Sequence, residues 1–144
     1  MKNLKYLFIY LLFISCEADK NEIFVEPVIN QWVFVACEGN FGASNGSISM
    51  INELGEVKHI KELGDVVQSV EVYKNKLFVI INNSHKIKVF DITIDGLRLP
   101  GIEIDTEGSS PREMKIINEK LYFTNWNSSD VKILNLTNYL IEGS

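Results

Sequence analysis

The histidines and cysteines of this sequence form no pattern that supports catalysis or metal binding. His59 and His85 lie in separate parts of the chain, outside any cluster with the spacing of metal ligands, and we expect both at the surface. Cys37 lies in the apolar run Val33–Cys37, where a small buried hydrophobic side chain is the expected role. The sequence also lacks a glycine-rich phosphate loop, a nucleophile elbow and a calcium-loop pattern. It therefore predicts no catalytic residue, no metal and no cofactor.

Amide and aromatic side chains in the short polar segments of the chain favour binding over catalysis. Amides carry a hydrogen-bond donor and an acceptor together, and aromatic rings offer flat apolar area on which a polar ligand can stack. The candidate binding residues are Asn40, Phe41, Asn45, Gln68, Asn82, Asn83, Arg112, Asn125, Trp126 and Asn127. This set suits a neutral ligand rich in amides or hydroxyls, such as a corrinoid or a glycan. The alternative is that these asparagines are ordinary turn residues and that Trp126 only caps an apolar core.

These polar segments occupy matching places in an internal repeat. Gln68–Thr93 aligns with Arg112–Thr137, 44 residues later, without a gap, and six positions are identical. Apolar residues alternate at the same places in both copies, with the two-residue period of β-strands. An earlier copy contains Val33–Cys37, and its loop Glu38–Gly46 is five residues longer than the matching loop of the second copy. A period of about 40–50 residues made of short strands indicates β-propeller blades.

The fold class that we predict is all-β, with β-propeller blades of four antiparallel strands each. The blades would cover about residues 24–63, 64–107 and 108–144, the last of them incomplete, within a domain of residues 23–144. Closed propellers have about four to eight blades, so these would be about three blades of a parent with about seven, and the chain would be an N-terminal fragment. The alternative is a small β-sandwich made from the same strands.

Alternating apolar runs define the expected strands. In the first copy they are Phe24–Ile29, Val33–Cys37 and Ser47–Asn52, and in the second Val70–Tyr73, Lys76–Ile81, Lys86–Ile92 and Leu97–Ile104. In the third copy they are Glu113–Ile117, Lys120–Thr124, Val131–Leu136 and the beginning of a fourth at Tyr139–Ile141. Alternate turns of an antiparallel blade lie at opposite ends, so the loops before the first strand and after the second share one face. That face holds all ten candidate residues, in Glu38–Gly46, Leu63–Gln68, Asn82–His85, Thr106–Arg112 and Asn125–Ser129.

The N-terminus has the organisation of a secretory signal. Met1–Ser15 contains two lysines followed by the apolar run Tyr6–Ile14, which is shorter than the roughly 20 residues of a membrane-spanning helix. Phe13-Ile14-Ser15-Cys16 resembles a bacterial lipobox, which implies cleavage before Cys16 and lipid attachment to its sulfur. Residues 16–22 would then be the acylated cysteine and a flexible tether. A short buried N-terminal helix is the alternative.

The charge balance excludes other kinds of partner. The chain has 14 basic and 19 acidic residues, and cleavage of the signal would remove Lys2 and Lys5, leaving 12 basic residues and a formal net charge of −7. This acidic balance offers no basic footprint for nucleic acid and no basic amphipathic face for a membrane surface. We therefore expect contact with the membrane only through the lipid on Cys16.

Segments of the third copy resemble the Tyr-Val-Thr-Asn (YVTN) propeller repeat. They are Pro111-Arg112-Glu113-Met114, Leu121-Tyr122-Phe123-Thr124-Asn125 and Val131-Lys132-Ile133-Leu134-Asn135. The first copy adds Glu38-Gly39-Asn40-Phe41-Gly42, which together with the lipobox is similar to the opening of propeller lipoproteins of Bacteroidetes. That group is described as surface-layer-like or as a domain of unknown function. The resemblance covers nearly the whole chain after Ser15.

The resemblance implies a lipoprotein exported to the outer membrane, at the cell surface. Some members of the group capture cobalamin and pass it to an outer-membrane transporter, so the implied partners are a corrinoid and a TonB-dependent transporter. Two other functions remain open. One is a propeller enzyme, similar to lactonases or quinoprotein dehydrogenases, with its site in blades outside this sequence. The other is a structural or protein-docking surface protein.

Overall fold

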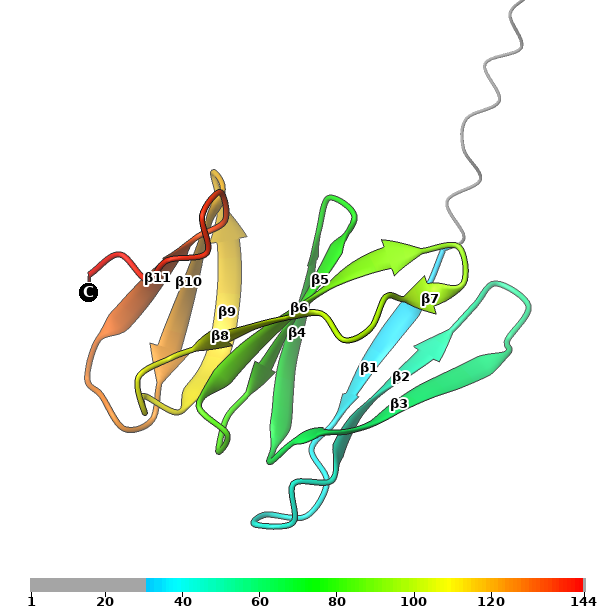
Figure 1. Ribbon diagram of the computed structural model, residues 1–144, viewed down its shortest axis with the longest axis horizontal. Coiled ribbons are helices and arrows are strands. Elements are labelled where there is room, and N and C mark those ends of the chain that lie inside the picture. The colour runs from blue at the N-terminus through cyan, green and yellow to red at the C-terminus, as the bar shows by residue number, and fades with distance from the viewer. Residues whose placement is uncertain (1–30, 144) are drawn as a thin grey trace, which may run out of the picture.

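A computed structural model describes residues 31–143 of the chain as three antiparallel sheets that lie side by side in chain order (Figure 1). Within this range the regular elements are all strands, and no helix capable of crossing a membrane occurs there. The predicted signal peptide Met1–Ser15, the predicted lipid site Cys16 and the predicted strand Phe24–Ile29 lie outside the described residues.

The strands of each sheet follow one another along the chain. The first sheet contains β1 (Val33–Cys37), β2 (Gly46–Ile51) and β3 (Val57–Gly64). The second contains β4 (Val67–Tyr73), β5 (Lys76–Ile81) and β6 (Lys86–Thr93), with β7 (Gly96–Leu97) and β8 (Ile102–Asp105) both paired to β6. The third contains β9 (Pro111–Ile117), β10 (Lys120–Asn125) and β11 (Val131–Asn135), and Ile141 adds a bridge to Leu134. The predicted all-β class is confirmed.

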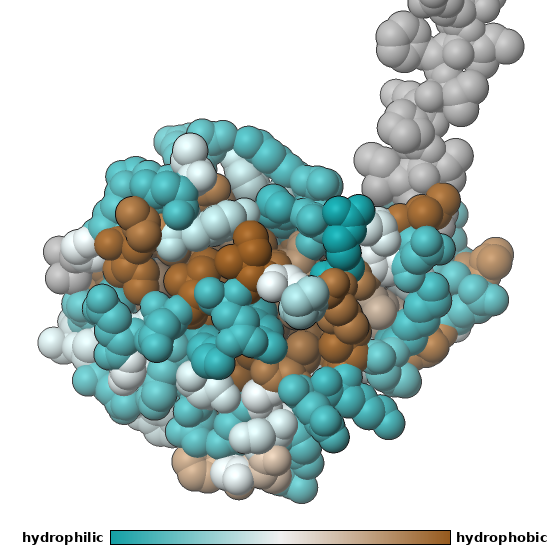
Figure 2. Space-filling model, in the orientation of Figure 1, coloured by the Kyte–Doolittle hydropathy of each residue, from teal (hydrophilic) through white to brown (hydrophobic). Residues whose placement is uncertain are grey.

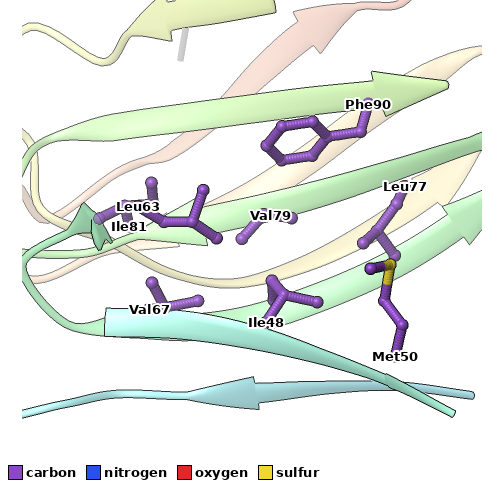
Figure 3. Close-up of a cluster of buried hydrophobic side chains, with 8 residues drawn as sticks. All are labelled: Ile48, Met50, Leu63, Val67, Leu77, Val79, Ile81 and Phe90. Atoms are coloured by element: carbon purple, nitrogen blue, oxygen red, sulfur yellow. The ribbon is translucent and has the colours of Figure 1, made fainter. Parts of the chain in front are cut away.

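Two apolar cores lie between neighbouring sheets, and β5 contributes to both. Leu77, Val79 and Ile81 of β5 point into the first core, between the first and second sheets (Figure 3). Phe78 and Ile80, at the intervening positions, point into the second core, between the second and third sheets. This explains the unbroken apolar run of β5, since a strand covered on both faces has no solvent-facing positions. Two cores that separate three sheets are the arrangement expected of stacked blades. A two-sheet sandwich has only one core.

Most strands predicted within the described range agree with the observed strands to within three residues at either end. The single predicted strand Leu97–Ile104 is wrong, because the chain is divided there into β7 and β8. Pro100 accounts for the break, since proline has no N–H to donate to a strand ladder. The next residue, Gly101, has a φ of 80°, and a Cβ there would lie 2.7 Å from the ring of Phe90.

The repeat recurs in the backbone hydrogen bonds. The N–H of Asn82, directly after β5, donates to the carbonyl of Val66 at 2.8 Å, and the N–H of Trp126, directly after β10, donates to the carbonyl of Ser110 at 2.9 Å. The two accepting residues lie 44 positions apart in the sequence. Both have a positive φ, 62° at Val66 and 53° at Ser110. These bonds tie the loop after the second strand of a blade to the loop before the first strand, so both loops lie at one end of the sheets.

Candidate functional site

The loops at this end of the sheets surround a hollow of about 260 Å³. We call it the loop-face hollow. Its lining residues are Glu38, Gly39, Phe41, Val66, Gln68, Asn82, Arg112 and Trp126. Five of the ten predicted binding residues are among them, and they come from all three sheets or from the loops that follow their strands.

Matching positions of the repeat supply most of the lining. Glu38, Asn82 and Trp126 are spaced 44 residues apart, and they directly follow β1, β5 and β10. Gln68 and Arg112 are also 44 residues apart, as the second residues of β4 and β9. Most of the lining therefore comes from two positions of the repeat. One directly follows β1, β5 and β10, and the other lies near the start of β4 and β9.

Asn82 forms a rigid part of the lining. Its side chain is 2% exposed, and its Nδ2 donates to the carbonyls of Ser110 at 3.1 Å and Pro111 at 2.8 Å. These bonds join the second sheet to the loop that starts the third. Because both amide protons are used within the protein, the Asn82 Nδ2 has none left to donate to a ligand.

Aromatic rings form the outer walls of the hollow. Trp126 is 65% exposed and Phe41 is 76% exposed, which is unusual for side chains of this size. The guanidinium of Arg112 lies over the indole of Trp126, 5.0 Å from the ring centre. A cation–π contact of this kind contributes about 0.5–1 kcal/mol at an exposed site, and it holds both groups in a stacked arrangement.

Gln68 lines the hollow and carries an unsatisfied polar atom below the surface. Its Oε1 is buried, and no donor of the described residues reaches it. A buried acceptor without a partner costs roughly 1–3 kcal/mol. Five buried side-chain atoms of the described residues are unpaired, and Gln68 is the one of these five residues that lines the hollow.

The other five predicted residues do not line the hollow, and most of them hold the loops together. Asn45 Oδ1 accepts the N–H of Asn40 at 2.8 Å, and Asn83 Nδ2 donates to the carboxylate of Asp65. Asn125 Nδ2 bonds to the carbonyl of Asp130 at 3.2 Å, and Asn127 Nδ2 bonds to the carbonyl of Gly108 at 3.2 Å. For these residues the hydrogen bonds favour the alternative interpretation of the sequence, in which the asparagines are ordinary turn residues.

Sequence reasoning missed Asp65, which organises the longest of these loops. Asp65 is 6% exposed, and its carboxylate oxygens accept the N–H of Gly42 at 2.9 and 3.0 Å as well as a bond from Asn83. It thereby fixes the loop that carries Phe41 against the second sheet. The available signal was an acidic residue enclosed by apolar residues in Leu63-Gly64-Asp65-Val66-Val67, where a buried charge needs partners.

The histidines differ in their surroundings. His59 is exposed as expected, and its Nδ1 lies 3.0 Å from the hydroxyl of Ser49. His85 is half-buried, and its Nδ1 accepts the N–H of Ser110 at 3.2 Å and contacts the hydroxyl of the same residue at 3.0 Å. The expectation that His85 is a plain surface residue is therefore wrong. In the described part of the chain no group of three potential metal ligands comes together.

Comparisons with known proteins identify the fold and no family. No family model matches the chain, and no curated protein matches it. A solved structure described as a crystal structure of a nidogen/laminin complex is similar, with a TM-score of 0.61 and 10% identity. The match covers 78% of this chain and 41% of that chain, so this chain spans less than half of its structural neighbour. At this identity the likeness shows the fold alone, and the protein is an all-β protein with a propeller-like arrangement of sheets.

Proposed function

We propose that the chain is a non-enzymatic binding scaffold that takes a ligand at the loop-face hollow. The observation that carries this proposal is the convergence of five predicted residues, remote in sequence, on one hollow, with an unpaired buried acceptor in one of the lining residues. Exposed aromatic walls beside a fixed amide give a site for stacking and for hydrogen bonding at once.

The proposed setting is the cell envelope. Cleavage before Cys16 and acylation of its sulfur would anchor the chain in the outer membrane at the cell surface, and the sheets would be about three blades of a larger ring of about seven. The lipobox-like Phe13-Ile14-Ser15-Cys16 and the YVTN-like repeats support this proposal. Globomycin-sensitive processing and mass spectrometry of the mature N-terminus test it, because an unmodified Cys16 would contradict the anchor.

Within this function, a corrinoid taken up through an outer-membrane transporter is the ligand that we propose. The support is the resemblance to cobalamin-capturing propeller lipoproteins, together with the amide chemistry of the site. The edge of a corrin ring carries several carboxamide groups. A hollow of about 260 Å³ has room for part of such a ligand, so contact would be made with its edge.

Calorimetric titration of the purified chain with cyanocobalamin tests this ligand. Heat that saturates at one site per chain is expected, with at least tenfold weaker binding in Arg112→Ala and Trp126→Ala, which remove the stacked pair. Asn75→Ala serves as the control, because Asn75 is an exposed amide in the turn between β4 and β5, outside the hollow. No heat from the wild-type chain would refute the corrinoid, and full binding by both hollow variants would refute the location.

A protein partner is the second candidate. The high exposure of Phe41 and Trp126 favours it, since exposed aromatic side chains often anchor protein interfaces. The similar solved structure is also described as a complex of two proteins. A pull-down with the TonB-dependent transporter that the resemblance implies, lost in Phe41→Ala and unaffected by cyanocobalamin, would favour this candidate over the first.

A further inference from the structure

The polar groups that remain free in the loop-face hollow define the kind of ligand it can hold. We infer that the hollow takes a planar, uncharged carboxamide group, an inference that rests on the proposed binding function. The three groups that carry it are Gln68, Arg112 and Glu38, since Asn82 uses both of its amide protons inside the protein.

Gln68 requires a hydrogen-bond donor from the ligand. Its Oε1 is buried and unpaired within residues 31–143, so a rotation of the side-chain amide that brings this oxygen to the hollow and onto a ligand N–H would replace an unsatisfied acceptor with a formed bond. A carboxylate has no proton to offer at neutral pH and would put a second acceptor against the first. A primary amide matches Gln68 in either orientation of its own side chain, because each group presents one donor and one acceptor.

Arg112 supplies the complementary donor. Its guanidinium is stacked on Trp126 and forms no ion pair with any carboxylate of the described residues. It can therefore donate to a ligand carbonyl oxygen while its face remains on the indole. Gln68 and Arg112 together can form hydrogen bonds with an N–H and a C=O, the two polar groups of one amide.

Charge and shape restrict the ligand further. Glu38 also lines the hollow, so its carboxylate balances the charge of Arg112 and leaves the site formally neutral. The exposed rings of Phe41 and Trp126 favour a flat group that can stack. A sugar hydroxyl can satisfy Gln68 but lacks the planar C=O and N–H pair, so the site is better matched to an amide than to a glycan.

Nicotinamide and nicotinate form a matched pair of probes, because both have a pyridine ring and only nicotinamide has an amide. We would titrate each into the ¹⁵N-labelled chain and follow the two indole N–H signals by NMR. Trp126 reports on the hollow, and Trp32 is the internal control because its Nε1 donates to the carbonyl of Thr93 at 3.1 Å. The Trp126 signal is expected to saturate with nicotinamide with a dissociation constant on the order of 1 mM, which is typical of so small a ligand. The dissociation constant for nicotinate is expected to be roughly tenfold higher.

A substitution at Gln68 separates the amide contact from stacking. Gln68→Met keeps the length of the side chain and removes the acceptor, so the preference for nicotinamide over nicotinate should disappear. Asn75→Ala, in the exposed turn between β4 and β5, should keep the preference. If Gln68→Met does not fold, the comparison of the two probes on the wild-type chain still tests whether the hollow prefers an amide. Equal affinity for both probes, or an unmoved Trp126 signal, would overturn the inference.

The outcome can be told apart from that of the corrinoid proposal. If nicotinamide is preferred but cyanocobalamin gives no heat, the corrinoid is refuted and the carboxamide site stands. If cyanocobalamin binds while the wild-type chain shows no preference between the two probes, the binding function stands and the carboxamide inference falls.

Discussion

At the scale of single residues, the buried carboxylate of Asp65 links the first and second sheets. It accepts hydrogen bonds from Gly42 and Asn83, and its own N–H donates to the hydroxyl of Ser84 at 2.8 Å. A buried carboxylate is tolerated when such donors surround it, and removing its charge leaves the donors without a strong acceptor. The position of the loop that carries Phe41 therefore depends on this side chain.

We expect Asp65→Asn to lower the free energy of unfolding by roughly 1–3 kcal/mol, because one carboxylate oxygen is replaced by an NH₂ that faces other donors. Urea denaturation measures this change, and hydrogen exchange should accelerate in residues 38–46. Asp95→Asn is the control, since Asp95 is exposed. Equal losses in the two variants would contradict the role given to Asp65.

Asp65 also shows where prediction from sequence reaches its limit. The alternation of apolar residues predicts most of the strands, and the order of turns predicts that Gln68, Arg112 and Trp126 share one face. It does not predict β3 (Val57–Gly64), because the polar residues of that strand break the pattern. Both are local properties of the chain. The partners of Asp65 are 18 and 23 residues away, and nothing in the local pattern specifies a hydrogen bond of that range. The five asparagines outside the hollow were grouped with the site because turn residues and ligand-binding amides have the same composition.

At the scale of the strands, β5 has the highest packing demand in the described chain because both of its faces are covered. Val79 of β5 is fully buried in the first core. Val35 of β1 lies at the matching position of the first copy, 44 residues earlier, and is 42% exposed. The same residue type at the same repeat position thus has two different environments.

We expect Val79→Ala to lower the free energy of unfolding by about 2 kcal/mol, from lost burial and the cavity left behind. Val35→Ala, the matched control, should change it by less than about 0.5 kcal/mol. Urea denaturation of both variants gives the comparison, and a cost at Val35 as large as at Val79 would show that the outer face of β1 is covered in solution.

An ion-pair cluster joins β8 to β6. Glu103 of β8 accepts bonds from Lys86 at 2.7 Å and Lys88 at 2.8 Å, and these bonds lower the pKa of Glu103 from 4.5 to about 2. A carboxyl with a lowered folded-state pKa stabilises the fold above its unfolded pKa, and this contribution is lost as the pH falls through the folded value.

Acidification from pH 4.5 to 2 should therefore remove the contribution of Glu103. The side chain of Glu103 is 45% exposed, so solvent screening limits the effect to no more than about 1 kcal/mol. Thermal unfolding at a series of pH values should show a shallower acid dependence in Glu103→Gln than in the wild type. Glu62→Gln, at another exposed glutamate, should leave the slope unchanged. An unchanged slope in Glu103→Gln would mean that the cluster contributes nothing.

At the scale of the whole molecule, the outer faces of the first and third sheets expose apolar side chains at repeat positions whose counterparts are buried between sheets. Val131 of β11 is 49% exposed, and its repeat counterpart Ile87 is fully buried in the second core. Val33 of β1 is 59% exposed, and its counterpart Leu77 is fully buried in the first core. Figure 2 shows a further apolar area near the middle of the face that it views, between polar margins.

We expect the isolated chain to self-associate through these apolar faces, because exposed apolar surface of this kind favours contact. Val131→Lys should weaken the association measured by sedimentation velocity by about tenfold or more. Leu54→Lys is the control, since Leu54 is 84% exposed but lies in a turn, away from both faces. A monomeric wild-type chain at high concentration would contradict this expectation.

The backbone bonds from Asn82 to Val66 and from Trp126 to Ser110 have a consequence for how this surface can change over time. They fix the main chain directly after β5 and β10 through atoms that every amino acid except proline possesses. At Trp126, which is 65% exposed, the side chain can therefore be exchanged while the main chain stays in place. Asn82 differs, because its side chain also holds the carbonyls of Ser110 and Pro111. New specificities could arise by single substitutions at the exposed position, on a framework that does not have to be rebuilt.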